Sequence, residues 1–451
     1  MEKRSTQFSG RLGFILAAAG SAVGLGNIWR FPYLAARYGG GVFLFFYILF
    51  ALTFGFSLMI AEVALGRKTG KGIVGAIKTL DKRFTFMGWF TLLIPIFTLP
   101  YYSVTGGWVM HYAMLFFTGK GAQTAEPGFF DSFIASPFWP VFWLCVFLAI
   151  SSAIVMLGVK KGIELTGKIF LPLLILLNAG IAVYALTLPG ALNGLLYYIT
   201  PDFTKFSFGT IIAALEQLFY SMSLAMGIMF TYGSYLSKQE NLETSVRQIE
   251  LFDTGIAILS GLVILPAVFA FSGSDPNALQ SGSGLMFITM PQVFQSMPLG
   301  GVIGAVFFLL VFFAAITSSV SFVETIVSVL GDQFGWKRVP ICIGVFFSSV
   351  LIGLCSALGF GIWRNFTVLG MNISEAFDFF TNSLFMPISA LFTCIFVGFI
   401  IGTNSAAEEV RLSSRFQGEK MFKIITKWVA PVCIIAILVS SILSAAGIFK
   451  L

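Results

Sequence analysis

Long apolar runs recur from one end of the chain to the other, and most charged residues fall between them. An apolar run of about 20 residues is long enough for a helix to cross the hydrocarbon core of a bilayer, which is about 30 Å thick. The pattern therefore predicts eleven membrane-spanning helices, at residues 12–36, 41–66, 86–118, 138–158, 166–188, 207–236, 248–272, 300–330, 340–360, 376–402 and 425–448.

Composition agrees with this pattern. Of the 451 residues, 57% are hydrophobic and only 10% are charged, whereas soluble domains carry about 25% charged residues. This excludes an ordinary soluble enzyme and predicts an all-α integral membrane protein. The five cysteines lie inside apolar runs, which is typical of small core residues and not of disulfides or metal ligands.

The basic residues predict the orientation in the membrane. Lys and Arg are retained on the cytoplasmic side, and most of the 27 in this chain fall on one side of the predicted helices if the N-terminus is cytoplasmic. We therefore expect a cytoplasmic N-terminus and an extracytoplasmic C-terminus. The net charge of +7 then reports topology and contact with anionic lipid, and we expect no nucleic-acid partner.

Two spans contain segments that suit a continuous helix poorly. In the first span Gly20, Gly24 and Gly26 fall within seven residues, and each glycine costs up to about 1 kcal/mol relative to alanine in a helix. The sixth span has a small and polar stretch at residues 220–227. Unwound backbone at membrane depth is tolerated only where it lines a cavity or an ion. The alternative is that these small residues only let helices pack closely.

Two interrupted helices five spans apart indicate an inverted repeat with a binding site near the membrane midplane. We expect residues 1–188 to form the first repeat of five helices and residues 189–404 the second. Residues 405–451 would add a cytoplasmic loop and span 11.

Several motifs carry a resemblance to a known family. They are RLGF at residues 11–14, GSAVGLGNIWRFP at 20–32, three glycines at 39–41, Tyr47, Tyr101-Tyr102, and residues 217–227, 313–319 and 378–380. Over nearly its whole length the chain resembles the neurotransmitter:sodium symporter family, especially its short bacterial members that carry amino acids. The resemblance implies a multi-pass protein of the bacterial inner membrane, not an enzyme, that couples sodium to amino-acid transport by alternating access.

The resemblance also implies two sodium sites. The first would be formed by Ala22, Asn27, Ser221 and Asp253, together with the substrate carboxylate; such oxygen ligands suit a hard cation. Two of these residues depart from the common pattern, with Ser221 in place of threonine and Asp253 in place of asparagine. The second site would be formed by Gly20, Val23, Ala314, Thr317 and Ser318. Taken alone, the hydroxyls of span 8 could instead bond to carbonyls four residues earlier.

The implied substrate is an amino acid. Monoamine carriers of the family have an aspartate where this chain has Gly24, so the substrate must bring its own carboxylate, to be met by the amides of Leu25 and Gly26 and the Tyr102 hydroxyl. The predicted lining is mostly apolar and uncharged, which favours hydrophobic or aromatic side chains; it comprises Ser21, Ala22, Leu25, Gly26, Thr98, Tyr102, Tyr220, Ser221, Ser223, Ala225, Met226, Ser318, Ser319 and Phe322. For Met226 and Phe322, ordinary core packing is the alternative.

Chloride-dependent relatives bind the anion at positions that read Tyr47, Gln217, Ser221 and Ala257 in this chain. Ala257 replaces a serine, and Asp253 supplies a fixed negative charge. We therefore expect chloride-independent transport, unless Asp253 is a neutral acid that bonds only to other side chains.

The charged residues and the resemblance together imply two gates, each closed by an ion pair. Arg30 and Asp378 would form an outer ion pair above Tyr220, and Asp332 would pair with Arg4 or Lys3 of the N-terminal tail. Glu62 is expected to support the break in span 1. No role is assigned to Glu216, Glu324 or His111, although Glu216 or Asp253 could carry a proton in a proton-coupled carrier, the nearer rival. A cation channel is the more distant rival. The expected assembly is a monomer or weak dimer.

Overall fold

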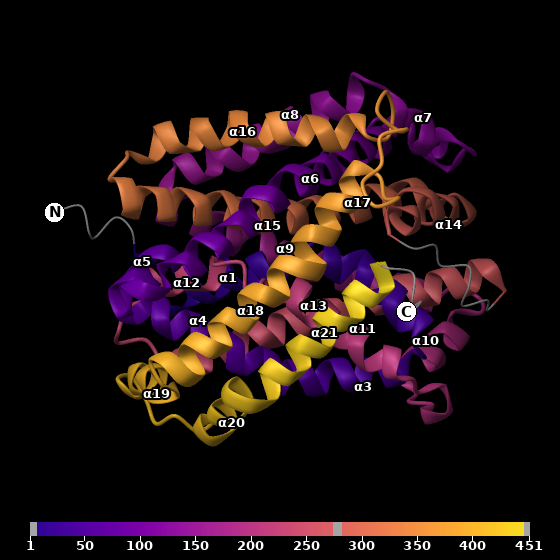
Figure 1. The fold of residues 1–451 in the computed structure, drawn as a ribbon. Helices are drawn as coiled ribbons and strands as arrows, with labels where there is room; N and C mark the ends of the chain where they lie inside the picture. Colours follow the sequence, from indigo (N-terminus) through magenta and orange to yellow (C-terminus); the bar gives the residue numbers. More distant parts are fainter. Residues whose placement is uncertain (1–6, 274–281, 446–451) are drawn as a thin grey trace.

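The computed structural model describes residues 7–273 and 282–445, and in these ranges the chain is built from helices (Figure 1). The predicted spans appear with boundaries shifted by a few residues, most at the N-terminal ends of spans 5, 7 and 11. The helices of the first half are α1 (Arg11–Ala22), η2 (Gly26–Arg30) and α2 (Phe31–Arg37) in span 1; α3 (Gly41–Phe50), η3 (Ala51–Gly55) and α4 (Phe56–Thr69) in span 2; α6 (Thr85–Phe117) in span 3; α8 (Trp139–Met156) in span 4; η6 (Val159–Glu164) and α9 (Leu165–Leu186) in span 5.

The second half also begins with an interrupted span. Its helices are α11 (Phe208–Ser221) and α12 (Ile228–Ser234) in span 6; α13 (Leu242–Ser272) in span 7; α15 (Gly300–Phe334) in span 8; α16 (Arg338–Leu358) in span 9; α17 (Ile373–Asp378), η10 (Phe379–Phe385), α18 (Met386–Ile395) and η11 (Phe396–Ile400) in span 10; α20 (Glu419–Ile424), η12 (Ile425–Val429) and α21 (Ala430–Ala445) in span 11.

Shorter helices cover the two ends of the bundle. They are α5 (Ile73–Leu80), η4 (Lys82–Phe84) and α19 (Thr403–Arg411) at one end, and η5 (Gly121–Ala125), α7 (Phe129–Ala135), α10 (Ala191–Ile199), η7 (Phe203–Lys205), η9 (Leu285–Thr289) and α14 (Met290–Ser296) at the other. In Figure 1, α5, α19 and α20 lie at the left end, and α7, α10 and α14 at the right.

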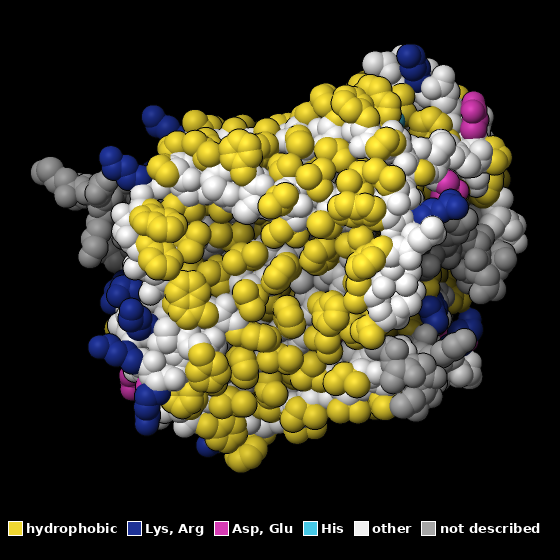
Figure 2. All heavy atoms as spheres, turned by 45° about the horizontal axis from the view of Figure 1, so that its top comes forward, with side chains coloured by type: hydrophobic (Ala, Val, Ile, Leu, Met, Phe, Trp, Pro, Cys, Tyr) yellow, Lys and Arg dark blue, Asp and Glu magenta, His cyan; other side chains and the backbone are white. Residues whose placement is uncertain are grey.

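Within the described ranges, nine continuous helices are long and apolar enough to cross a membrane, and the pair of α1 and η2–α2, bent by 58°, makes a tenth. Helices α11 and α12 are each shorter and are separated by residues 222–227. Counted as one interrupted crossing, they give the eleven spans expected from the hydropathy pattern. Hydrophobic side chains cover the middle of the face in Figure 2, with Lys and Arg at its edges, as expected for a protein surrounded by lipid.

The two interrupted helices lie inside the bundle. Helix α1 contacts α9, α13 and α15, and α12 packs against α4. Glycines allow the α4–α12 approach: a Cβ on Gly66 would lie 2.0 Å from the Phe230 carbonyl oxygen, and one on Gly233 would lie 2.5 Å from that of Val63. Close packing through small residues therefore occurs in this protein, and an added Cβ at Gly24 or Gly26 of span 1 would also meet a neighbouring side chain within 3 Å.

Candidate functional site

Span 1 is interrupted where its glycines are densest. Helix α1 ends at Ala22, and Val23 is extended, with φ −72° and ψ 104°. The chain resumes a helical course at Gly26, where a π-helical turn begins. In between, the Gly24 amide donates to Asn27 Oδ1 at 3.0 Å. A side chain thus replaces a backbone acceptor, and the broken helix predicted from the glycines is confirmed.

Span 6 is interrupted over residues 222–227, where Ser223, Ala225 and Gly227 all have positive φ, at 52°, 61° and 77°. Such a conformation costs a non-glycine residue of the order of 1–3 kcal/mol and persists only when its surroundings hold it. The Ala225 amide donates to Glu62 Oε1 at 2.7 Å. The Ser223 hydroxyl donates to the Ser21 carbonyl of span 1 at 3.1 Å. Glu62 therefore supports the break in span 6, whereas the sequence had suggested span 1.

The side chains predicted for the first sodium site meet between the two breaks. Asn27 Nδ2 donates to Asp253 Oδ1 at 2.7 Å and to the Ser221 hydroxyl at 2.9 Å. Ser221 donates to the two Asp253 carboxylate oxygens at 2.9 and 3.0 Å. The Tyr47 hydroxyl lies 3.1 Å from Ser221 Oγ and 3.3 Å from Asp253 Oδ2. All four side chains are buried. Tyr47, Ser221 and Asp253 bring oxygen atoms together, the ligand type that suits a hard cation, whereas Asn27 turns its Nδ2 to them and its Oδ1 to the Gly24 amide.

Residues predicted for the second sodium site lie where α1 meets α15. An ideal Cβ on Gly20 would be 3.6 Å from the Thr317 side chain. The Ser318 hydroxyl donates across to the carbonyls of Ser21 at 3.0 Å and Val23 at 3.3 Å. Thr317 Oγ1 donates within its own helix, to the Phe313 carbonyl at 2.9 Å and the Ala314 carbonyl at 3.1 Å. Thr317 thus follows the back-bonding alternative, whereas the Ser318 hydroxyl reaches the carbonyls of span 1.

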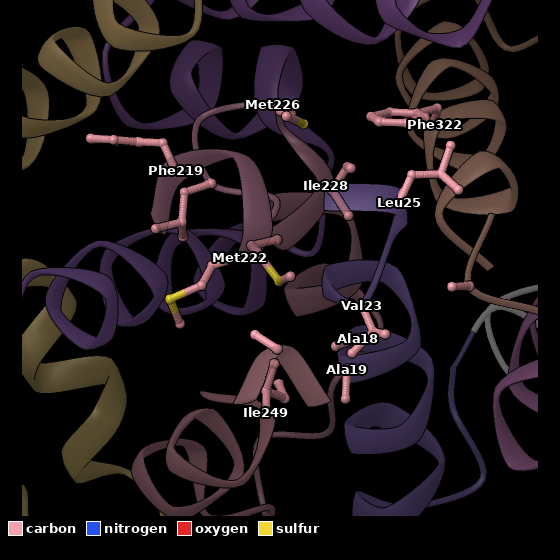
Figure 3. Packing of buried hydrophobic residues seen from close by; sticks show 14 of the residues in the cluster. Ala18, Ala19, Val23, Leu25, Phe219, Met222, Met226, Ile228, Ile249 and Phe322 are labelled. Atoms are coloured by element: carbon pink, nitrogen blue, oxygen red, sulfur yellow. The ribbon is translucent and has the colours of Figure 1, made fainter. Parts of the chain in front are cut away.

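A small cavity of about 20 Å³, room for about one water, lies beside both clusters. Most of the predicted substrate-contacting residues line it, together with Gly24 and Asn27: Ser21, Ala22, Leu25, Gly26, Thr98, Tyr102, Tyr220, Ser223, Met226, Ser318 and Phe322. Leu25 and Phe322 approach it from opposite helices, with Met226 nearby (Figure 3). A Cβ on Gly24 would lie 2.9 Å from the Ser318 hydroxyl and 3.2 Å from that of Tyr102, so a side chain at Gly24 has no room.

Three predicted pocket residues lie elsewhere. Ser221 belongs to the Asp253 cluster, and the Ala225 amide is bound to Glu62. The Ser319 hydroxyl pairs with that of Ser151 on α8 at 2.8 Å. The sequence could not distinguish Ser318 from Ser319, because neighbouring positions of one helix face different elements.

Above the cavity lies a vestibule of about 670 Å³, lined in part by Trp29, Arg30, Tyr33, Trp108, Phe360 and Asp378. Leu25, Tyr102 and Tyr220 line both spaces, so they form the partition between them. The Arg30 guanidinium carbon is 5.3 Å from the centre of the Tyr220 ring.

The charges around the vestibule differ from the expected pairing. In the described part of the chain, Arg30 is paired with Glu216, with Nη2 3.5 Å from Oε2, and not with Asp378. Asp378 Oδ1 instead accepts hydrogen bonds from the Tyr101 hydroxyl at 3.2 Å and from Asn382 Nδ2 at 2.7 Å. No part in the gate was predicted for Glu216, although its position four residues before Tyr220 placed both on one face of α11.

Other contacts join the helices at the opposite end. Arg4 and Lys3 lie outside the described residues, and Asp332 Oδ2 accepts a hydrogen bond from the Gly72 amide at 2.9 Å. Phe8 packs against the rings of Tyr232 and Tyr235. Glu324, which also had no predicted role, is fully buried and paired with Arg338. His111 stacks on Phe133 with ring centres 4.3 Å apart, a packing role.

The family profile described as the sodium:neurotransmitter symporter family matches residues 5–125 and 135–448. The chain belongs to this family. It is 32% identical to the sodium-dependent transporter YhdH of Bacillus subtilis, with 98% of each chain covered. It is 26% identical to the sodium- and chloride-dependent GABA transporter 2 of Bos taurus, with 88% of this chain and 72% of the relative covered. The crystal structure of MhsT in complex with L-phenylalanine matches with 37% identity and a TM-score of 0.88, over 97% of this chain and 99% of MhsT.

These similarities confirm several predictions. The protein is an all-α membrane transporter with an inverted repeat of five helices, in which helices 1 and 6 are broken. It is a sodium-dependent symporter and not an enzyme.

Proposed function

We propose that this protein carries hydrophobic or aromatic L-amino acids into the cell together with sodium, by alternating access. The observation that carries the proposal is the meeting of two unwound segments between a buried cluster of oxygen atoms and an uncharged, mostly apolar cavity. Helix ends and free carbonyls at such a break can hold a cation and a zwitterion together. MhsT was solved with L-phenylalanine, which supports an aromatic substrate.

Two sodium ions are proposed. The first would be held by Ala22, Asn27, Ser221 and Asp253 with the substrate carboxylate, because Asp253 brings a full negative charge to a buried position. An unpaired carboxylate in such surroundings is costly, and a bound cation would offset that cost. The second ion would be held at the α1–α15 contact by Gly20, Val23, Ala314, Thr317 and Ser318.

The amino acid would bind in the cavity below Tyr220. Its carboxylate would meet the amides of Leu25 and Gly26; the Tyr102 hydroxyl already lies 3.4 Å from the Leu25 amide nitrogen. Its side chain would lie among Leu25, Met226 and Phe322. Because the cavity is small, binding requires side chains at the partition to move, and the flexible Met226 suits such a change.

Chloride independence is part of the proposal. Asp253 contacts Tyr47 and Ser221, two of the positions that bind chloride in chloride-dependent members. A fixed carboxylate there supplies the negative charge that chloride would bring, and it would repel the anion.

The proposed setting is the bacterial inner membrane, with the N-terminus cytoplasmic and the C-terminus extracytoplasmic. Residues 1–188 and 189–404 form the two repeats, and residues 405–451 the cytoplasmic loop and span 11. We propose a monomer or weak dimer. For closure, Arg30 pairs with Asp378 above Tyr220 on the outside, and Asp332 pairs with Arg4 on the inside when that side is shut.

The test is uptake of a panel of radiolabelled amino acids by purified protein in liposomes, with and without an inward sodium gradient, and with chloride replaced by gluconate. We expect saturable uptake of L-phenylalanine and similar substrates that needs sodium and persists in gluconate. Uptake driven by a proton gradient without sodium would replace this mechanism with proton coupling. A sodium current that needs no substrate would indicate a channel.

A further inference from the structure

Glu216 lies beside the outer vestibule without lining it. It is on α11, four residues before Tyr220, so the two side chains lie on the same face of that helix. Arg30 contacts both: its Nη2 is 3.5 Å from Glu216 Oε2, and its guanidinium is stacked over the Tyr220 ring. The Ser441 hydroxyl of α21 is 3.5 Å from the other Glu216 oxygen. One arginine is thus held on the α11 side of the vestibule by a carboxylate and a ring.

Asp378 belongs to a different group on α17. Its carboxylate is bound by Tyr101 of α6 and by Asn382, and it lines the vestibule as Arg30 does. The charged residues that line the vestibule are Arg30, Arg37, Glu375 and Asp378, and Glu216 lies beside Arg30 without lining it. While Arg30 is paired with Glu216, no ion pair in the described structure links Arg30 to Asp378. The vestibule of about 670 Å³ above Tyr220 is then not bridged by these two residues.

The Arg30 and Glu216 side chains are 31% and 25% exposed. Arg30 lines the vestibule, and its separation of 3.5 Å from Glu216 exceeds the length of a strong charge-assisted hydrogen bond, about 2.7–2.9 Å. Such a long ion pair is weak and can be exchanged for another. An arginine with two competing weak partners is suited to a gate, because neither position is strongly preferred and small changes in the site below can decide between them.

We propose that Glu216 is a positioning residue of the outer gate, which holds Arg30 away from Asp378 and so favours the open vestibule. Closure exchanges the partner of Arg30 from Glu216 to Asp378 and brings the guanidinium across the top of Tyr220. This inference rests on the proposed function, since it assumes that the vestibule opens and closes during transport.

The test measures how fast a positively charged methanethiosulfonate reagent labels a cysteine placed in the vestibule. Thr105, which lines the vestibule from α6, is replaced in T105C, and labelling of the parent chain with its own five cysteines is subtracted. In this background E216Q should slow labelling several-fold, because Arg30 is released to Asp378. E216D, which keeps the charge, should largely restore the rate.

Two further variants serve as an independent test and as a control. D378N removes the competing partner and should speed labelling, so it tests the exchange even if E216Q does not fold. E375Q is the matched control. Glu375 also lines the vestibule, but its carboxylate accepts a hydrogen bond from the Asn372 amide at 3.0 Å, and among the described residues Arg30 is paired with Glu216 and not with Glu375. E375Q should leave the rate within about two-fold of the parent, as expected for an exposed carboxylate that caps its own helix and forms no ion pair with Arg30 in the described structure.

Kinetics give a second readout. A gate biased toward closure retains substrate, so E216Q should lower kcat and KM together in uptake assays, whereas loss of structure would lower kcat alone. Unchanged or faster labelling in E216Q, slower labelling in D378N, or an equal effect of E375Q would overturn the inference. Labelling needs no transport: normal sodium-driven uptake with unchanged labelling would refute the role of Glu216 alone, and absent uptake would refute the proposed function alone.

Discussion

A methyl group on Gly26 should weaken substrate binding by a predictable amount. An ideal Cβ at this position would lie 2.3 Å from both Cδ1 and Cε1 of Tyr220, whereas carbon atoms in good contact are about 3.5–4.0 Å apart. In Gly26→Ala the ring must therefore move by more than about 1 Å. Tyr220 is part of the partition between vestibule and cavity, so its displacement disturbs both.

Overpacking of this kind costs about 1–3 kcal/mol. If the cost falls on the bound state, the Kd for L-phenylalanine rises about 5- to 150-fold, since each 1.4 kcal/mol corresponds to a factor of ten. Equilibrium binding of the radiolabelled amino acid to purified protein measures this directly. The matched control is Gly180→Ala on α9, where nothing lies within 4 Å of the added methyl.

A second substitution tests the cause. If the clash with the ring is responsible, removing the ring in Gly26→Ala/Tyr220→Leu should cost less binding free energy than the sum of the two single substitutions. Neighbouring residues that share a contact do not behave additively. A Kd for Gly26→Ala within two-fold of the parent, with a folded protein, would refute the reasoning.

Three other substitutions probe the site and its support. Asp253→Asn exchanges a charged acceptor for a neutral one at the Ser221 cluster. Because hydrogen bonds to charged groups contribute about 1 kcal/mol more than neutral ones, the sodium concentration for half-maximal binding should rise at least about 5-fold. An unchanged sodium titration would contradict a ligand role. Glu62→Ala leaves the buried Ala225 amide without its acceptor, at a cost of about 1–3 kcal/mol; thermal unfolding should show a lower midpoint than in Glu62→Gln, which retains an acceptor. Arg338→Met leaves Glu324 buried without its ion-pair partner and should destabilise the protein by about 3–5 kcal/mol. Arg338→Met/Glu324→Leu should recover part of that stability. Equal thermal unfolding midpoints for the single and the double variant would count against this ion pair.

The spans and the interruption of span 1 could be predicted because their signals are local. Apolar length sets each crossing, and the glycines at 20, 24 and 26 disfavour a helix wherever the rest of the chain lies. The break in span 6 was harder to place. Ser223 and Ala225 adopt positive φ although neither residue type favours it, and what holds them there is a contact with Glu62 of span 2 and with the backbone of span 1.

Partners across the bundle were predicted less well. The family pattern pairs Arg30 with Asp378, yet in the structure Glu216 is the residue that it contacts. Both carboxylates lie near the outer end, and the choice between them depends on side-chain rotation and on the state of the vestibule, which sequence does not encode. Ser319 illustrates the same limit, since its hydroxyl turns to Ser151 of α8 while the adjacent Ser318 turns to span 1.

The most direct measurement is an experimental structure of the purified protein with sodium and L-phenylalanine, at a resolution that shows ions. The account predicts a cation in contact with oxygen atoms of Ala22, Asn27, Ser221 and Asp253, and the ligand carboxylate beside it at the amides of Leu25 and Gly26. A ligand bound elsewhere, or a continuous helix through residues 22–26 with no cation beside Asp253, would contradict it.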